Sequence, residues 1–321
     1  MLVPNKLKPG DVIRIVAPSR SANILSKVVI LQATKTLESL GFVLTFGQHI
    51  FKSDLQHSTS IENRVKDLHD AFRDPDVKGI ITVIGGYNSN ELLPYLDYDL
   101  IAKNPKVFCG YSDITAIATA ITEKTGLITY SGPSFSSFAM EKEQVYQSEC
   151  FSNCVMQEKK YTLPPSKRWS DDQWYIEQDY RRFRDTEWKV YNEGSAEGAV
   201  YGGNLCTLNL LQGTPYLGSL EDVILFVEDD ELSSPEIFSR DLTSLLQYCG
   251  TIKGLVVGRF QDESRMTQEQ LEFILAKHPI LRKVPVMYDV DFGHTQPICT
   301  FPIGGSVEIR TDKKTITFTE F

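Results

Sequence analysis

The chain has 321 residues, of which 33 are Lys or Arg and 42 are Asp or Glu, so its formal net charge is −9 at pH 7. With 41% hydrophobic and 23% charged residues, the composition is that of a folded protein and not of a disordered one. The acidic balance argues against a nucleic-acid polymer as partner, because neutralising backbone phosphates requires clustered Lys and Arg side chains.

The chain carries no signal for a membrane or for secretion. No run approaches the ~20 apolar residues that a transmembrane helix needs, and the start lacks the apolar core and cleavage site of a signal peptide. The six cysteines form no Cys-x-x-Cys pair, and Cys150 and Cys154 have no second ligand pair near them. We therefore expect a cytoplasmic protein with reduced thiols, no metal site and no membrane partner.

Short apolar runs alternate with helical patterns through the first half of the chain. Runs at residues 11–17, 43–46, 79–84 and 107–109 predict strands, and the apolar spacing at residues 26–40, 61–72, 90–96 and 114–123 predicts helices. Strands that alternate with helices predict βαβ units and a mostly parallel sheet that is covered on both faces.

The middle of the chain changes character. Residues 159–192 carry all three tryptophans, Trp169, Trp174 and Trp188, together with two adjacent prolines and no sustained period. Three indoles offer too much apolar surface to leave in water, so we predict an ordered crossover segment here and not a disordered one.

A second α/β region follows this crossover. Strands are predicted at residues 223–227, 252–257 and 286–290, helices at residues 207–211, 234–246 and 267–277, and a closing hairpin at residues 305–321. The length suggests about two domains. We therefore predict an α/β domain at residues 1–158, the crossover at residues 159–192 and a smaller α/β domain at residues 193–321.

Ser112 is the best candidate nucleophile. It follows the buried strand at 107–109 and precedes a helix, and a sharp strand–turn–helix is the setting of a nucleophile elbow. The amide of Asp113 at the helix start could stabilise an oxyanion. The alternative is a simple helix cap, because Ser and Asp are favoured there, and Ile114 stands where the Gly-x-Ser-x-Gly pattern needs glycine.

A serine nucleophile needs a base, and His294 is the candidate among five histidines. It lies in a loop bounded by Gly293 and Pro297 directly after a predicted strand, where parallel sheets place active-site groups. Glu228 ends the buried run at 223–227, where a carboxylate could orient a histidine. The alternatives are an ordinary polar loop for His294 and a solvated turn or a Mg²⁺ or Ca²⁺ cluster for the acids at 228–231.

Two glycine pairs lie at strand ends, Gly85-Gly86 and Gly202-Gly203. Either could cradle a phosphate with backbone amides. Neither matches a dinucleotide or P-loop motif, and paired glycines also serve ordinary tight turns, so a nucleotide cofactor is not expected.

Six separated segments resemble the LD-carboxypeptidase family of serine peptidases, in the family's order and over essentially the whole chain. They are Ala17-Pro18-Ser19, Gly85-Gly86-Tyr87-Asn88, Gly110-Tyr111-Ser112-Asp113, Gly202-Gly203-Asn204-Leu205, Leu225-Phe226-Val227-Glu228-Asp229 and Gly293-His294. Within that family, the long Trp-rich crossover resembles the microcin C self-immunity branch. The murein-recycling carboxypeptidases carry a shorter segment there.

The resemblance implies an α/β fold with a doubly wound, flavodoxin- or amidotransferase-like N-terminal domain, a smaller C-terminal α/β domain and usually a homodimer. It implies a Ser–Glu–His triad in which Ser112 is the nucleophile, His294 the general base and Glu228 the group that orients the imidazole. No metal or cofactor is needed for this chemistry.

Further contacts are implied by the same resemblance. The oxyanion hole would be formed by the backbone amides of Asp113 and Gly85, with Gly86 as a possible substitute. Substrate contacts would fall on Asn204, on the acidic tract that ends at Glu231, and on Trp169 or Trp174, one of which would stack on a nucleobase.

Three functions compete on these grounds. The first is hydrolysis of the amide bond of an aminoacyl- or peptidyl-nucleotide, which the Trp-rich crossover favours because a base needs a stacking platform. The second is a cytoplasmic carboxypeptidase that acts on murein tetrapeptide. The third is a non-catalytic nucleotide-binding module. A glutamine amidotransferase is disfavoured because its elbow needs cysteine, and Cys109 lies three residues too early.

Overall fold

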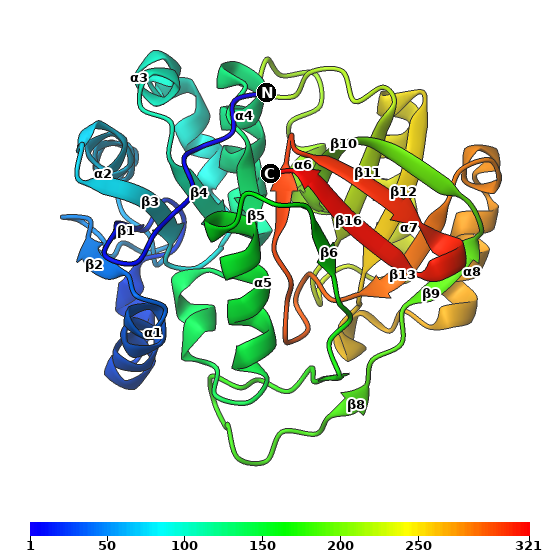
Figure 1. The fold of residues 1–321 in the computed structure, drawn as a ribbon, viewed down its shortest axis with the longest axis horizontal. Helices are drawn as coiled ribbons and strands as arrows, with labels where there is room; N and C mark the ends of the chain where they lie inside the picture. The colour runs from blue at the N-terminus through cyan, green and yellow to red at the C-terminus, as the bar shows by residue number, and fades with distance from the viewer.

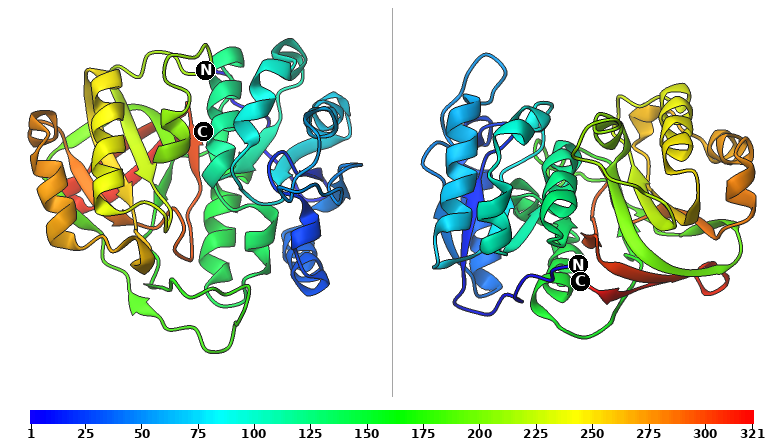
Figure 2. Two further views of the ribbon diagram at one scale, coloured as in Figure 1. Left: turned by 180° about the vertical axis from the view of Figure 1, so that it is seen from behind. Right: turned by 90° about the horizontal axis from the view of Figure 1, so that it is seen from above.

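The computed structural model describes residues 1–321 and places them in two lobes that lie side by side (Figures 1 and 2). One lobe is built around a six-stranded sheet, five strands of which come from the first half of the chain and one from residues 301–303, and the other around an eight-stranded sheet from the second half. The two termini lie close together between the lobes (Figure 2). No helix combines the length and apolar character needed to cross a membrane.

The first sheet has the strand order β14-β5-β4-β3-β1-β2. Its strands are β1 (Val12–Val16), β2 (Val43–Phe46), β3 (Val77–Thr82), β4 (Val107–Gly110), β5 (Thr129–Ser131) and β14 (Phe301–Ile303). All pairings are parallel except that of β14 with β5. The five parallel strands follow one another in the order β2-β1-β3-β4-β5, which is the order of a flavodoxin-like doubly wound sheet. The predicted α/β fold class is therefore confirmed.

Helices cover the first sheet, as the alternating pattern predicts (Figure 1). They are α1 (Lys27–Ser39), α2 (Ile61–Arg73), α3 (Tyr98–Lys103), α4 (Thr115–Thr125) and α5 (Gln144–Met156). The Ser26 and Ser60 side chains cap α1 and α2 by accepting from backbone amides. Helix α4 carries eight consecutive buried residues because it lies between the two lobes.

The second sheet has the order β6-β16-β15-β10-β11-β12-β13-β9. Its strands are β6 (Tyr161–Leu163), β9 (Lys189–Asn192), β10 (Ser195–Asn204), β11 (Val223–Glu228), β12 (Ile252–Gly258), β13 (Val286–Val290), β15 (Ser306–Arg310) and β16 (Thr315–Glu320). The four central strands β10 to β13 are parallel. Helices α6 (Leu205–Asn209), α7 (Pro235–Cys249) and α8 (Gln268–Ala276) accompany them. Figure 2 shows α7 and α8 over one face.

The crossover at residues 159–192 contributes more regular structure than its pattern indicates. Its ends form β6 and β9, which are the two edge strands of the second sheet, and β7 (Arg168–Trp169) pairs with β8 (Arg184–Asp185) in a small hairpin. These strands are two to four residues long. That is too short for a period of two to stand out in the sequence.

Short 3₁₀ turns complete the structure. They are Ala22–Ile24, Ser89–Tyr95, Ser112–Ile114, Phe135–Ala139, Asp262–Ser264, Pro279–Arg282 and Thr311–Lys313. Four of them follow parallel strands of the first sheet at its carboxyl edge: Ala22–Ile24 follows β1, Ser89–Tyr95 follows β3, Ser112–Ile114 follows β4 and Phe135–Ala139 follows β5. The strand order reverses between β1 and β3, and open α/β sheets bind ligands outside their carboxyl ends at such a reversal.

Candidate active site

Ser112 lies at the end of β4 in a backbone conformation unusual for a residue with a side chain. Its φ is +64°, in the left-handed region. The strained turn between β4 and the 3₁₀ turn that leads into α4 directs Oγ out of the sheet edge, as in a nucleophile elbow. The predicted strand–turn–helix setting of Ser112 is therefore present.

His294 reaches Ser112 from the other lobe. Its loop follows β13, and its Nε2 atom lies 3.0 Å from Ser112 Oγ. The Tyr111 ring lies against the imidazole, with ring centroids 5.5 Å apart. The loop histidine chosen from the sequence thus meets the serine, although 182 positions separate them in the chain.

Glu228 stands at the carboxyl end of β11 and is 3% exposed. The His294 Nδ1–H donates to its Oε2 at 2.8 Å. Gly293 makes this approach possible, because a Cβ there would lie 2.9 Å from Glu228 Oε2. Burial alone lowers the pKa of His294, but the charges of Glu228, Asp230 and Asp229 outweigh it and raise that pKa to about 9.

Gly85 packs directly against the serine. A Cβ on Gly85 would lie 2.9 Å from Ser112 Cβ and 3.6 Å from the Asp113 amide nitrogen, whereas a Cβ on Gly86 would meet Ser19 and Arg20. The Gly85 and Gly86 amides donate to no other protein group. Free amides beside a serine are able to hold an oxyanion. Of the two glycines, Gly85 is the one in contact with Ser112.

The acidic tract lies beside this constellation. Asn204, at the end of β10, pairs in register with Glu228, and its Oδ1 caps α6 by accepting from Thr207. Its Nδ2 lies 3.4 Å from Asp229 Oδ1. Burial and the neighbouring Glu228 charge raise the pKa of Asp229 to about 7. Glu231 is exposed. No three His, Cys, Asp or Glu side chains gather in a geometry that could hold a metal ion.

The two candidate tryptophans have different surroundings. The guanidinium groups of Arg184 and Arg259 both lie over the Trp169 ring, each 4.7 Å from its centroid. Trp174 is 7% exposed and packs edge-on against Tyr175, at 5.9 Å. The third tryptophan, Trp188, is buried, and its Nε1–H donates to Asp291.

Tyr175 and Arg20 are residues that the sequence reasoning missed. Tyr175 is 60% exposed, and burial and the Glu231 charge raise its pKa while Arg20 opposes the shift. Arg20 donates from Nε to the Gly85 carbonyl at 3.1 Å. The exposed Tyr175 ring therefore lies near charged side chains of both lobes, Arg20 of the first and Glu231 of the second. The only signal in the sequence was the position of Arg20 directly after Ala17-Pro18-Ser19.

Comparison with known proteins identifies relatives along the whole chain. Residues 13–132 match the family model of the LD-carboxypeptidase N-terminal domain, and residues 197–309 match that of the LD-carboxypeptidase C-terminal domain. "Putative carboxypeptidase YocD" of Bacillus subtilis (strain 168) is 47% identical over 309 residues, which cover 95% of each chain. The microcin C7 self-immunity protein MccF of Escherichia coli is 32% identical over 336 residues, covering 99% of this chain and 96% of MccF.

Solved structures agree with these relatives. An MccF-like protein from Bacillus anthracis str. Ames superposes with a TM-score of 0.98 at 48% identity over the full length of both chains. MccF in complex with aspartyl sulfamoyl adenosine superposes with a TM-score of 0.92 at 30% identity, over 100% of this chain and 99% of that one.

The two-lobed α/β fold and these relatives define a hydrolase of the peptidase class. The chain belongs to the LD-carboxypeptidase family of serine peptidases, as the six sequence segments predict.

Proposed function

We propose that this protein is a serine amidohydrolase that cleaves the amide bond of aminoacyl- or peptidyl-nucleotides with Ser112, His294 and Glu228 as its triad. The observation that carries the proposal is the continuous chain of contacts from Ser112 Oγ to His294 Nε2, at 3.0 Å, and from His294 Nδ1 to Glu228 Oε2, at 2.8 Å. A nucleophile, a base and a group that orients the base are what acyl transfer requires.

The reaction follows from this order of contacts. Neutral His294 takes the Ser112 proton as Oγ attacks the amide carbonyl, and Glu228 stabilises the imidazolium that forms. The amides of Asp113 and Gly85 hold the developing oxyanion. The imidazolium then protonates the leaving nitrogen, and a water molecule activated by His294 hydrolyses the acyl-enzyme.

The nucleotide part of the proposal is supported by the relatives and by the crossover. MccF, which this chain matches along its whole length, has been solved with aspartyl sulfamoyl adenosine and with glutamyl sulfamoyl guanosine. Neither candidate indole presents a free face, because Trp174 is buried and two guanidinium groups occupy the Trp169 ring. The exposed ring of Tyr175, against which Trp174 packs edge-on, is the better base platform, with Trp174 supporting it from beneath.

The acyl part is expected to be neutral or cationic. Asp229, Asp230 and Glu231 follow Glu228 directly, and Asn204 is held beside Asp229. Such a tract favours a neutral side chain or an ammonium group over an acidic one, so this protein should accept the aspartyl and glutamyl groups of the compounds solved with MccF less well than a lysyl group. The second candidate is cleavage of murein tetrapeptide, because the murein tetrapeptide carboxypeptidase of Pseudomonas aeruginosa is 27% identical over 297 residues, covering 88% of this chain and 89% of that protein.

The test is to incubate the protein with aspartyl sulfamoyl adenosine, its lysyl counterpart and murein tetrapeptide, and to follow the products by mass spectrometry. We expect cleavage of the sulfamoyl adenosines, with the lysyl compound preferred. Ser112→Ala and His294→Ala should each lose activity by roughly a thousandfold or more. Ser39→Ala, on the exposed end of α1, is the matched control and should retain full activity. Retention of more than a few per cent of activity by folded Ser112→Ala would contradict the triad, and cleavage of murein tetrapeptide alone would contradict the substrate.

A further inference from the structure

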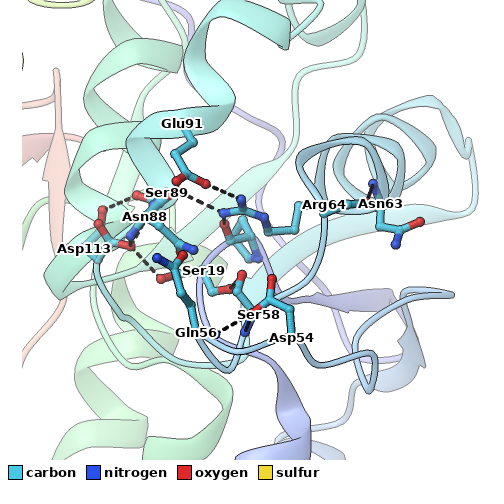
Figure 3. Close-up of polar contacts among 12 residues, drawn as sticks. Ser19, Asp54, Gln56, Ser58, Asn63, Arg64, Asn88, Ser89, Glu91 and Asp113 are labelled. Atoms are coloured by element: carbon cyan, nitrogen blue, oxygen red, sulfur yellow. Dashed lines mark hydrogen bonds and ion pairs between the residues drawn. The ribbon is translucent and has the colours of Figure 1, made fainter.

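Three loops meet at the carboxyl edge of the first sheet, and the Asp113 side chain lies at their junction (Figure 3). The loops follow β1, β3 and β4 and comprise residues 17–20, 85–89 and 111–113. Asp113 Oδ2 accepts from Ser19 Oγ at 2.5 Å, from the Asn88 amide at 3.1 Å and from the Ser89 amide at 2.9 Å. Ser89 Oγ donates in return to the Asp113 carbonyl at 2.6 Å.

The Asp113 carboxylate does not act as a helix cap. Aspartate in the first turn of a helix is ordinarily explained by hydrogen bonds to the amides of its own helix. Here every hydrogen bond to the carboxylate comes from the two neighbouring loops, and the residue is only 3% exposed. Burying a carboxylate costs free energy unless it accepts hydrogen bonds. The three hydrogen bonds from the neighbouring loops offset this cost for Asp113.

Arg64 of α2 forms hydrogen bonds with two of these three loops (Figure 3). It is 3% exposed, and its Nη1 donates to the carbonyls of Pro18 at 3.3 Å and Asn88 at 3.0 Å. Its Nη2 pairs with Glu91 at 2.5 Å. One guanidinium therefore joins the loop after β1 to the loop after β3 and ties both to α2.

These contacts bear on the oxyanion hole. Gly85 begins the 85–89 turn, its amide is free, and it packs on Ser112, so the position of that amide relative to Oγ depends on how the turn is held. We propose that the Asp113 carboxylate and the Arg64 guanidinium are positioning residues that hold the Gly85 turn at the distance from Ser112 that the oxyanion hole requires. Neither group touches the reacting atoms; both act through the turn.

The inference rests on the proposed function, and the experiment separates the two. An alkyl fluorophosphonate reports on the oxyanion hole without depending on the natural substrate. Ser112 Oγ attacks phosphorus, the P–O bond forms as the P–F bond breaks, fluoride leaves and the serine proton passes to His294. The maximal inactivation rate, kinact, reports the chemical step, and the half-saturating concentration, KI, reports reagent binding.

Removal of the positioning groups should slow the chemical step alone. We expect Asp113→Ala and Arg64→Met to lower kinact by about 10- to 100-fold, with KI changed less than about twofold, because small displacements of a catalytic group have effects of this size. Asp113→Asn keeps an acceptor oxygen facing Ser19, Asn88 and Ser89, so its kinact should stay within about threefold of wild type.

Asp67→Ala is the matched control. Asp67 is a buried carboxylate of the same helix as Arg64, and it accepts from the His49 amide at 2.8 Å and ring nitrogen at 2.7 Å, in the loop after β2. Its loss should lower the melting temperature as Asp113→Ala does, but leave kinact within about twofold of wild type.

The outcomes are distinct. If folded Asp113→Ala and Arg64→Met react within twofold of wild type, or if Asp67→Ala slows kinact as much as they do, the positioning role is overturned. If Asp113→Ala does not fold, Ser19→Ala and Ser89→Ala decide, because each removes one bond to Asp113, and unchanged kinact in both overturns the inference. A wild-type protein that is not labelled, or a labelled Ser112→Ala, contradicts the proposed function instead.

Discussion

Ser112 is held in a conformation that other residues of the chain have to stabilise. A left-handed φ of +64° costs an L-residue of this kind roughly 1–2 kcal/mol, and the flanking β4 and α4 impose it. Gly85 faces it without a side chain, and Gly293 leaves room for Glu228. At the residue scale, the candidate site is marked by a strained serine and by two glycines that leave room for neighbouring groups to approach.

The raised pKa of His294 predicts an alkaline activity profile. The imidazole acts as a base only when neutral, and its pKa in the folded protein is about 9. The value of kcat/KM should therefore rise with pH and reach half its maximum near pH 9, as measured on the cleaved sulfamoyl adenosine in buffers of constant ionic strength.

Glu228→Gln is the variant that tests the cause. The Glu228 charge is the largest influence that raises the His294 pKa, and burial opposes it. The rise in kcat/KM should move to lower pH in the variant, while the plateau falls by roughly a hundredfold or more because the imidazolium loses its partner. A profile that stays centred near pH 9 in Glu228→Gln would contradict this assignment.

The raised pKa of Asp229 predicts that its charge destabilises the folded protein above pH 7. Its pKa is raised from 3.8 to about 7, so the folded protein disfavours the charge that the unfolded chain carries freely above pH 4. Asp229→Asn should therefore raise the free energy of unfolding at pH 8, by at most about 4 kcal/mol, with the gain fading as the pH falls from 7 to 4. Urea denaturation at pH 8 and pH 4 measures it. Exposed Asp312→Asn is the control, and equal stability of Asp229→Asn and wild type at pH 8 would contradict the prediction.

At the scale of elements, the crossover is fastened to the loop that carries His294. Asp291, which is fully buried, accepts from the Ser166 amide at 2.9 Å, the Trp188 Nε1–H at 2.8 Å and Arg259 Nη2 at 2.8 Å. Ser170 and Gln296 exchange two backbone hydrogen bonds close by. The crossover and the His294 loop are therefore one packed unit.

Loss of Asp291 should weaken this unit strongly. Asp291→Ala leaves the 4%-exposed Arg259 side chain without its carboxylate and should lower the free energy of unfolding by about 3–5 kcal/mol. Asp312→Ala, which breaks a 3.7 Å pair with Arg310 between half-exposed side chains, should cost less than about 1 kcal/mol. Urea denaturation compares the two, and similar losses in both would show that Asp291 does not fasten the crossover.

At the scale of the whole molecule, each lobe supplies part of the site. Ser112, Asp113 and Gly85 follow strands of the first sheet, whereas Glu228 ends β11 of the second sheet and His294 follows β13. Helix α4 begins just after Ser112 and packs against β10, β14 and α6, so Ser112 stands at the junction of the lobes. A movement of one lobe relative to the other would separate Ser112 from His294.

The net charge of −9 predicts that the protein binds a mononucleotide but not a nucleic-acid polymer. A polymer presents many phosphates to an acidic surface, whereas a mononucleotide presents one. In fluorescence polarisation at low salt, a labelled single-stranded DNA of about 20 nucleotides should not bind, whereas AMP should protect the protein against thermal unfolding. Salt-sensitive DNA binding would contradict this prediction.

Most elements could be predicted from the sequence because their patterns are local. The strand at 43–46 and the helix at 61–72 agree with β2 and α2 to within one residue, since alternation and capping serines act over a few positions. The short strands β6 to β9 and the return of β14 to the first sheet were not predicted. The pairing partners of β6, β9 and β14 lie far away in the chain. Strands β7 and β8 pair with each other, but at two residues each they carry too little pattern.

The sequence by itself determined the family, the α/β class, and the candidates Ser112, Glu228 and His294, because each stands at the end of a recognisable apolar strand. Only the tertiary structure decided that these three side chains lie within hydrogen-bond distance, that Gly85 rather than Gly86 faces Ser112, and that arginines cover Trp169. The physical reason is that a strand pattern indicates where a loop begins. The distance between loops from different lobes depends on how whole sheets pack.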